Sequence, residues 1–360
     1  MEEGNGLGFI ALIVVWGGLF YLIFFTPLIS GTSGNHFLAS ALSSFSRVSD
    51  TQQKEVIAIF NKEGNYKKTN LHFNKSVDIL DIEASPIDSS LIFAGSNQGL
   101  FVSKDSGLNW YNFSDVEHKI NSDAKVYKIA FNPNKTTEEF ISVFYGNKGT
   151  IYKSRDNFFS LEKIFEINNE AVYDFDIDGS NLYLGLSNGR LLLHSLEKNG
   201  NRVLTSFNSP ISQLKVFGYT GLIYLTLKSG GFWVSANFGQ SFERMKFLDN
   251  YAGANKINHF ESSIINNALI YAATDYGLIR SLNSGESWQV FKSLPTEESS
   301  ISALAFEENK NEIFAASNGK IYTSFDNGLS WQITDTGISG RIISIIKPIG
   351  DKIVVGTKRS

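Results

Sequence analysis

One acidic run stands out among the residues that could take part in catalysis or metal binding: Asp174-Phe175-Asp176-Ile177-Asp178-Gly179. Alternating carboxylates of this kind open a calcium-binding loop, but the twelfth position of such a loop is a glutamate and here it is Gly185. The alternation fits a strand that carries its carboxylates on one face and its apolar side chains on the other. We therefore predict no metal site here. Asp78 and Asp81 lie in a comparable stretch nearer the N-terminus.

The other residue types that support catalysis or metal binding form no constellation. The sequence contains no cysteine, which excludes disulfides, a thiol nucleophile and a thiolate metal site. With 32 basic and 36 acidic residues the formal net charge is −4, which argues against a nucleic-acid-binding protein. We predict no cofactor. The histidines lack metal-ligand spacing; they are His36, His72, His118, His194 and His259.

The N-terminal part of the sequence contains an apolar segment, residues 7–29, that carries no charge. As a helix it is long enough to cross a bilayer, so we predict a transmembrane helix after a short tail over residues 1–6. No Lys or Arg precedes the segment, and the small-residue pattern Ala39-Ser40-Ala41 lies far beyond its end. These features favour a retained anchor over a cleaved signal peptide. Residues 30–54 are expected to be a flexible tether.

The rest of the chain repeats a polar turn, which we call the corner turn. It begins with Ser, has Asp or Asn two residues later and Gly two residues after that, and ends on an aromatic residue. Its leading serines are 40 to 51 residues apart, and a sixth, eroded copy begins at Ser195. The other copies are Ser103, Asp105, Gly107 and Trp110; Ser154 and Asp156, without Gly or Trp; Ser235, Asn237, Gly239 and Phe242; Ser281, Asn283, Gly285 and Trp288; and Ser324, Asp326, Gly328 and Trp331.

This spacing is typical of a β-propeller blade of four short strands. Ahead of each corner turn lies a second signal, a Gly- or Asn-containing hairpin between apolar strands. Propellers commonly bind partners on the face where such hairpins gather. The candidate binding face therefore comprises Asn97, Gln98, Lys148, Asn188, Asp275 and Tyr276.

The corner turn resembles the Asp-box, or BNR repeat, of sialidases, sortilin-type receptors, certain xyloglucan hydrolases and photosystem II assembly-factor propellers. The resemblance covers nearly the whole chain after about residue 55, and its repeat style is closest to the assembly-factor and sortilin-like propellers. It implies that each turn joins the third and fourth strands of a blade. The Asp would bond its own turn, and the Trp would be buried between blades. The corner residues are therefore expected to be structural, and none is assigned to catalysis.

The predicted fold class is all-β: a single β-propeller over residues 55–360, with seven four-stranded blades and with six or eight left open. Strands over 341–348 and 352–357 are expected to pair with 56–60 and with a fourth strand around 71–73, which closes the ring from both chain ends. Aligned with the other repeats, the acidic run lies on an innermost strand. This placement predicts an acidic wall in the central channel.

The functional prediction depends mainly on features that some of the similar families have and that this sequence lacks. Sialidases carry an arginine triad and a Phe-Arg-Ile-Pro signature, and none of the eight arginines lies in that signature. Sortilin-type receptors carry a disulfide-rich module that a chain without cysteine cannot form. The sequence favours a membrane-anchored, non-enzymatic propeller that binds a protein partner or acts as an assembly scaffold. The resemblance places it outside the cytoplasm. The alternative is a cell-surface glycoside hydrolase or a glycan-binding propeller.

Overall fold

The computed structural model describes residues 12–16, 19–23, 56–62, 64, 66–67, 76–113, 115–294 and 299–360. The chain divides into two compact units, Met1–Gln53 and Lys54–Ser360. In the first unit, β1 (Leu12–Trp16) pairs antiparallel with β2 (Leu19–Ile23).

No helix among the described residues is long and apolar enough to cross a membrane. The rest of the predicted membrane helix over 7–29, the tail over 1–6 and the whole tether over 30–54 fall outside the described residues. The helix, the tail and the tether therefore stay predictions.

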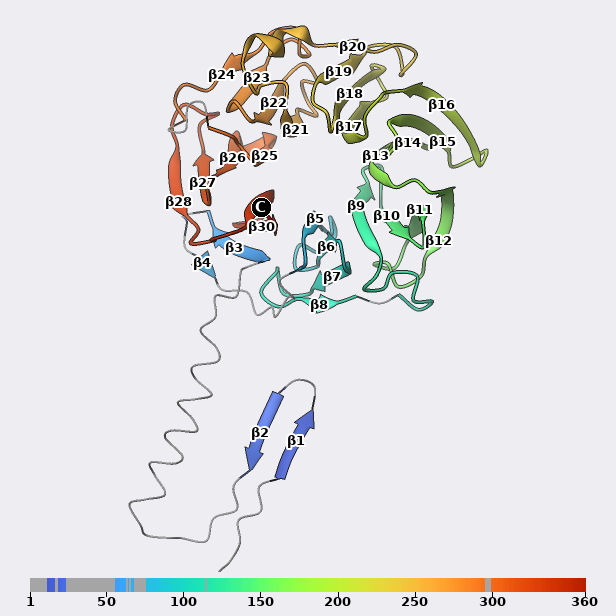
Figure 1. Ribbon diagram of the computed structural model, residues 1–360, viewed down its shortest axis with the longest axis vertical. Coiled ribbons are helices and arrows are strands. Elements are labelled where there is room, and N and C mark those ends of the chain that lie inside the picture. The colour runs from blue at the N-terminus through green and yellow to red at the C-terminus, as the bar shows by residue number, and fades with distance from the viewer. Residues whose placement is uncertain are drawn as a thin grey trace, which may run out of the picture. The chain divides into compact units, whose positions relative to one another are not determined.

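The described residues of the second unit form seven four-stranded antiparallel sheets arranged around a central opening (Figure 1). The predicted seven-bladed propeller is therefore confirmed. Blades 1 to 3 contain β5 (Ile79–Ala84), β6 (Ile92–Ser96), β7 (Gly99–Ser103) and β8 (Tyr111–Asn112); β9 (Lys125–Asn132), β10 (Lys135–Tyr145), β11 (Lys148–Ser154) and β12 (Glu162–Asn168); and β13 (Val172–Asp178), β14 (Asn181–Leu186), β15 (Arg190–Ser195) and β16 (Gly200–Ser206).

Blades 4 to 6 follow the same order from the channel outward. They contain β17 (Ile211–Phe217), β18 (Leu222–Leu227), β19 (Phe232–Ser235) and β20 (Glu243–Arg244); β21 (Ile257–Ser262), β22 (Ile270–Thr274), β23 (Leu278–Ser281) and β24 (Gln289–Val290); and β25 (Ala303–Glu307), β26 (Glu312–Ser317), β27 (Lys320–Ser324) and β28 (Gln332–Asp335). Two short 3-10 helices, η1 (Lys246–Asn250) and η2 (Glu308–Lys310), lie in loops.

Blade 7 closes the ring with strands from both ends of the chain. Its order is β29 (Ile342–Ile349), β30 (Lys352–Lys358), β3 (Ile57–Asn61) and β4 (Tyr66–Lys67). Lys62 also forms ion pairs with Glu307 and Glu312 of blade 6. The predicted closure is confirmed. Its fourth strand lies at Tyr66–Lys67, whereas residues 71–73 fall outside the described part.

The core lies in the gaps between blades. The second strand of each blade is buried on both faces because a neighbouring sheet covers each side; every residue of β6 and β22 is buried. Such strands are continuous apolar runs, as in Ile92-Phe93-Ala94, and show no polar alternation. Hydrophobic clusters then combine residues of successive blades, such as Phe93 of β6 with Ile129 of β9.

Candidate functional site

The corner turns use their polar side chains within the turn itself. The Oγ of the leading Ser accepts the backbone N–H four residues on, at 2.7 to 2.9 Å in the four glycine-containing copies. The same hydroxyl donates to the Asp or Asn Oδ1 at 2.8 to 3.0 Å. That Oδ1 also accepts a second backbone N–H four residues further on. The turn is therefore held by three hydrogen bonds that need only an oxygen at the Asp position.

The charge of the corner carboxylates is fixed by the same bonds. Hydrogen bonds from Ser330 and Ser324 lower the pKa of Asp326 to about 2. Desolvation opposes ionisation at Asp105, but hydrogen bonds from Asn109 and Ser103 lower its pKa overall. A carboxylate that is ionised and surrounded by its own donors is a poor general acid or base. These side chains therefore serve the fold.

The blade 2 corner keeps this geometry without glycine. Phe158 takes the glycine position with φ 66°, and its N–H donates to Ser154 Oγ at 3.0 Å. Glu139 of β10 accepts the N–H groups of Asn157 and Phe158, both at 3.1 Å. The Phe158 ring is fully buried and meets Phe93 at 5.0 Å between centroids. The role of Glu139 could not be predicted from the sequence, because this residue lies on another strand of the blade.

The eroded copy at Ser195 is a plain hairpin. Ser195 ends β15, its Oγ accepts the N–H of Lys198 at 3.3 Å, and β16 begins at Gly200. A corner turn needs the bond from Ser to the residue four positions on. Here the hydroxyl accepts the N–H three residues on instead, and Ser195 itself pairs with Gly200.

The closing tryptophans differ in burial. Trp110 and Trp288 are 5% and 6% exposed, and the Trp288 ring meets Phe232 edge-on at 5.4 Å. Trp331 is only partly buried, against Phe291 at 6.1 Å. The expectation that every closing Trp is buried is wrong for Trp331. Its indole lies at the edge of the gap, where Nε1 reaches Ser293 Oγ at 3.3 Å.

The candidate binding face lies at the hairpins between second and third strands, as predicted, but its polar side chains have partners within the fold. Asn97 Oδ1 accepts the Asp78 N–H at 2.8 Å, and Gln98 Nε2 donates to Ser76 Oγ. Asn188 Oδ1 caps its own hairpin through the Arg190 N–H. The remaining three positions make contacts of other kinds: Lys148 to Glu166 at 3.0 Å, Asp275 to Lys256 at 2.6 Å, and the Tyr276 ring to Tyr251 at 5.2 Å.

The channel wall is not acidic, and this prediction is wrong. Carboxylates on one innermost strand face lysines on the next: Asp81 with Lys128 at 3.4 Å, Asp176 with Lys215 at 3.1 Å, and Glu83 with Lys347 at 2.7 Å. The acidic run was placed correctly on an innermost strand, but strand alternation carries no information on partners in neighbouring blades.

The carboxylates of Asp174, in the acidic run, and of Asp81, in the equivalent strand of blade 1, also connect neighbouring blades directly. Asp81 accepts the Ile129 N–H and Asp174 accepts the Leu214 N–H, each at 2.7 Å. Burial raises the pKa of Asp174 to about 6, against the opposing effect of Lys128. Among the described residues, no group of three or more His, Cys, Asp or Glu side chains could hold a metal ion.

A cluster that was not predicted from the sequence lies on the face formed by the hairpins between second and third strands, which we call the hairpin face. We call this cluster the mouth cluster; it comprises Tyr127, Tyr173 and Lys228. The two tyrosine rings, near the starts of β9 and β13, are 4.9 Å apart, and Lys228 Nζ lies 3.9 Å from the centroid of Tyr173. Tyr127 and Tyr173 occupy the same position in successive repeats, Val126-Tyr127-Lys128 and Val172-Tyr173-Asp174. Comparison of the inner strands would have found them.

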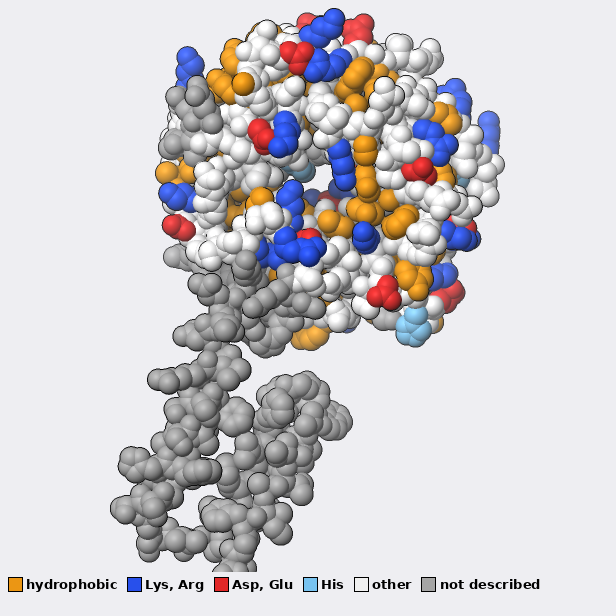
Figure 2. Space-filling model, viewed as in Figure 1, with side chains coloured by type: hydrophobic (Ala, Val, Ile, Leu, Met, Phe, Trp, Pro, Cys, Tyr) orange, Lys and Arg blue, Asp and Glu red, His pale blue; other side chains and the backbone are white. Residues whose placement is uncertain are grey.

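The electrostatics of the mouth cluster favour an incoming partner. Lys228 forms no ion pair with any described residue, and burial lowers its pKa. Burial and the neighbouring Tyr173 raise the pKa of Tyr127 to about 12, so that the Tyr127 ring is neutral at physiological pH. Figure 2 shows further Lys and Arg side chains gathered around the opening. An aromatic surface with an unpaired cation can bind a carboxylate or an aromatic group.

Comparisons with known proteins show the fold. No family model matches the chain, and no curated protein matches it. The solved structure of YCF48 bound to D1 peptide has TM-score 0.60 and 13% identity, covering 85% of this chain and 98% of that one. YCF48 from Cyanidioschyzon merolae has TM-score 0.59 and 16% identity, with coverages of 79% and 95%. The extracellular domain of BT4673 from B. thetaiotaomicron has TM-score 0.60 and 18% identity, covering 80% of this chain and 38% of that one.

Proposed function

We propose that this chain is an Asp-box β-propeller that binds a segment of a partner protein and catalyses no reaction. The observation that carries the proposal is the likeness in fold to YCF48, over nearly the whole length of a chain solved with a D1 peptide bound. The corner turns support the Asp-box assignment, since their polar atoms form hydrogen bonds within the turn, as that repeat requires. Nothing in the likeness assigns this chain the same partner.

The hairpin face is the proposed binding surface, with the mouth cluster at its centre. The six positions predicted from sequence already contact other residues of the fold through hydrogen bonds, ion pairs or a ring contact, so they shape the face. Lys228 and the two tyrosines are left to contact a partner. An ammonium that lies 3.9 Å from an aromatic ring and has no carboxylate partner among the described residues would pair favourably with an acidic group on that partner.

Anchoring to a membrane through residues 7–29, with the propeller outside the cytoplasm, is part of the proposal. Its support is the uncharged apolar run and the resemblance to extracytoplasmic propellers. The fold likeness to the extracellular domain of BT4673 is consistent with this location. Accessibility of residues 54–360 to protease in sealed cells would test it: digestion from outside supports the proposal, and protection contradicts it.

Binding is tested by capture from native membranes with the full chain as bait. We expect Lys228→Gln and Tyr173→Ala each to reduce capture of the specific partner at least tenfold. The matched control is Lys148→Gln, a lysine of the same face that already pairs with Glu166, and it should capture normally. Equal capture by all variants would contradict the proposed surface, and glycan hydrolysis by the purified chain would contradict the binding function.

A further inference from the structure

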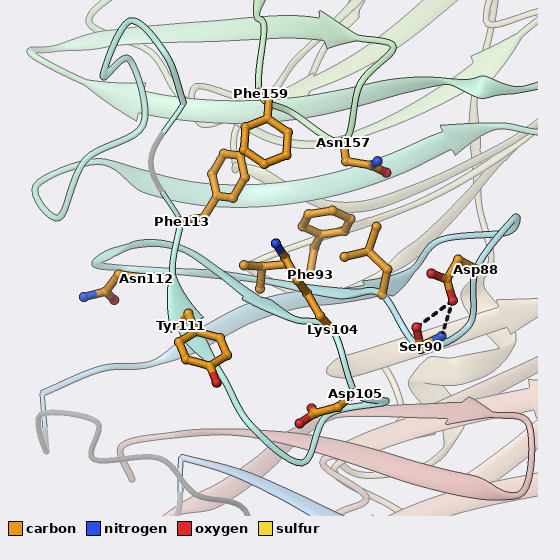
Figure 3. Close-up of a pocket in the computed structure, with 12 residues that line it drawn as sticks. Asp88, Ser90, Phe93, Lys104, Asp105, Tyr111, Asn112, Phe113, Asn157 and Phe159 are labelled. Atoms are coloured by element: carbon orange, nitrogen blue, oxygen red, sulfur yellow. Dashed lines mark hydrogen bonds between the residues drawn. The ribbon is translucent and has the colours of Figure 1, made fainter.

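The gap between blades 1 and 2 contains a cavity of about 740 Å³ near the corner turns, which we call the gap cavity (Figure 3). This volume is within the roughly 300–1,000 Å³ of typical ligand pockets. Phe93, Val102, Lys104 and Phe113 of blade 1 line it, and Phe159 of the blade 2 corner closes it from the other side.

Two side-chain contacts at the equivalent gap between blades 5 and 6 have no counterpart in blade 1. Arg280, which precedes its corner Ser just as Val102 does, lies 5.2 Å from the Phe291 ring. Val102 shares a hydrophobic cluster with Phe113 but carries no cation to place on that ring. Tyr271, equivalent to Phe93, extends its hydroxyl to Asn327 Oδ1 at 3.1 Å. Blade 1 supplies neither the guanidinium nor the hydroxyl.

The walls of the gap cavity are aromatic and partly exposed. Phe113 meets Phe159 at 5.6 Å and meets Phe93 edge-on at 6.4 Å. Phe159 is 47% exposed, and Tyr111, which stands opposite Val102 on β8, is 60% exposed. Aromatic rings in this arrangement leave faces and edges open to a further ring, whose burial would remove apolar surface from water.

One cation faces this aromatic site. The Lys104 side chain points toward Phe93 and Phe113 in Figure 3, and it forms no ion pair with any described residue. The carboxylates of Asp88 and Asp105 also line the cavity, but neither forms an ion pair with Lys104. A negative group entering beside the ring would therefore complement the site.

The cavity opens beside the edge strand of its sheet. β8 is the outermost strand of blade 1, and its two residues, with Phe113, form one side of the cavity. An extended peptide can align with such an edge while one side chain enters a neighbouring pocket. This geometry favours a polypeptide segment over a free small molecule.

We propose that the gap cavity binds an extended segment of a partner protein, which inserts one aromatic side chain between blades 1 and 2 and places a carboxylate beside Lys104. The site is independent of the hairpin face. It lies among the corner turns, so binding there neither requires nor excludes binding at the mouth cluster.

The test is titration of the full chain with three acetylated, amidated pentapeptides, followed by ligand-detected NMR. The probes are Gly-Asp-Trp-Ser-Gly, its Lys-Trp analogue and its Asp-Ala analogue. We expect saturable binding of the Asp-Trp peptide, at least tenfold weaker binding of the Lys-Trp peptide, and no binding of the Asp-Ala peptide. Absence of saturable Asp-Trp binding up to about 1 mM would overturn the proposal.

Single substitutions test whether the peptide binds in the gap cavity. Val102→Arg reproduces the arginine of blade 5 and should reduce Asp-Trp affinity at least tenfold, whereas Val234→Arg, the same change at the equivalent position of blade 4, should leave it unchanged. Lys104→Gln should remove the preference for the Asp-Trp over the Lys-Trp peptide. If Val102→Arg does not fold, Phe159→Ala, at an exposed ring, replaces it with the same expected loss. Unchanged affinity in the folded variants would overturn the proposal.

Discussion

The corner turns and the mouth cluster use polar groups in opposite ways. In a corner turn the Ser hydroxyl and the Asp oxygen are bonded to the backbone four residues on, within the same turn. In the mouth cluster an ammonium lies on a tyrosine ring without a carboxylate from any described residue. The polar residues that recur in the sequence therefore stabilise the fold of this protein. The groups free to bind a partner are those whose bonds the fold leaves incomplete.

The largest expected effect is on the buried corner tryptophans. Trp288→Ala removes an indole that is 6% exposed and bonded to Gly285 O, and it should lower the free energy of unfolding by about 3–5 kcal/mol. Trp331→Ala should cost about half as much, since that indole lies at the edge of its gap. Denaturant unfolding measures both. Equal losses would show that exposure does not distinguish the two corners.

A smaller effect is expected at the corner carboxylates. Asp105→Ala leaves the Asn109 N–H and the Ser103 hydroxyl without their acceptor, and should cost about 1–2 kcal/mol. Asp105→Asn keeps that oxygen, as Asn237 and Asn283 do in other blades, and should cost under about 0.5 kcal/mol. If both variants were equally destabilised in chemical denaturation, charge rather than hydrogen bonding would hold the turn.

The buried carboxyl group of Asp174, on the channel wall, is expected to make the stability of the fold depend on pH. Burial raises the pKa of Asp174 to about 6, above its value in the unfolded chain. The folded state therefore binds this proton more tightly, and the associated stability is present at low pH and lost as pH rises through about 6. Asp174→Asn cannot titrate at this position. The melting temperature of the variant should therefore rise relative to that of the unsubstituted chain as the pH increases from 5 to 8. A constant difference over this range would contradict the assignment.

The smallest effect on stability is expected at the mouth cluster. Lys228 is exposed and bonded to no described carboxylate, so Lys228→Gln should change the free energy of unfolding by less than about 0.5 kcal/mol. The same variant should lose partner capture. A large loss of stability would place Lys228 among the structural residues and remove the contrast with the corner turns.

The fold was predictable because its signals are local. The corner turn recurs in blades 1, 2, 4, 5 and 6 with a hairpin ahead of it. The pairing of β3 with β30 follows from half a blade at each end of the sequence. The blade 7 outer strand was misplaced because Tyr66–Lys67 is only two residues long and carries no pattern.

The site was less predictable because it depends on contacts between blades. The charges of Asp81 and Lys128, the support that Glu139 gives to Phe158, and the contact of Lys228 with Tyr173 join residues that no local spacing relates. The same is true of the exposure of Trp331, which depends on the neighbouring blade. Each of these features became visible only in the folded ring.

The contrast between the two kinds of region is tested most directly by photo-crosslinking in native membranes. A photoreactive residue replaces either Tyr173 in the mouth cluster or Leu329 in the blade 6 corner, a side chain that is 80% exposed. The account predicts a specific protein adduct from position 173 and none from position 329. An adduct from the corner position alone would contradict it.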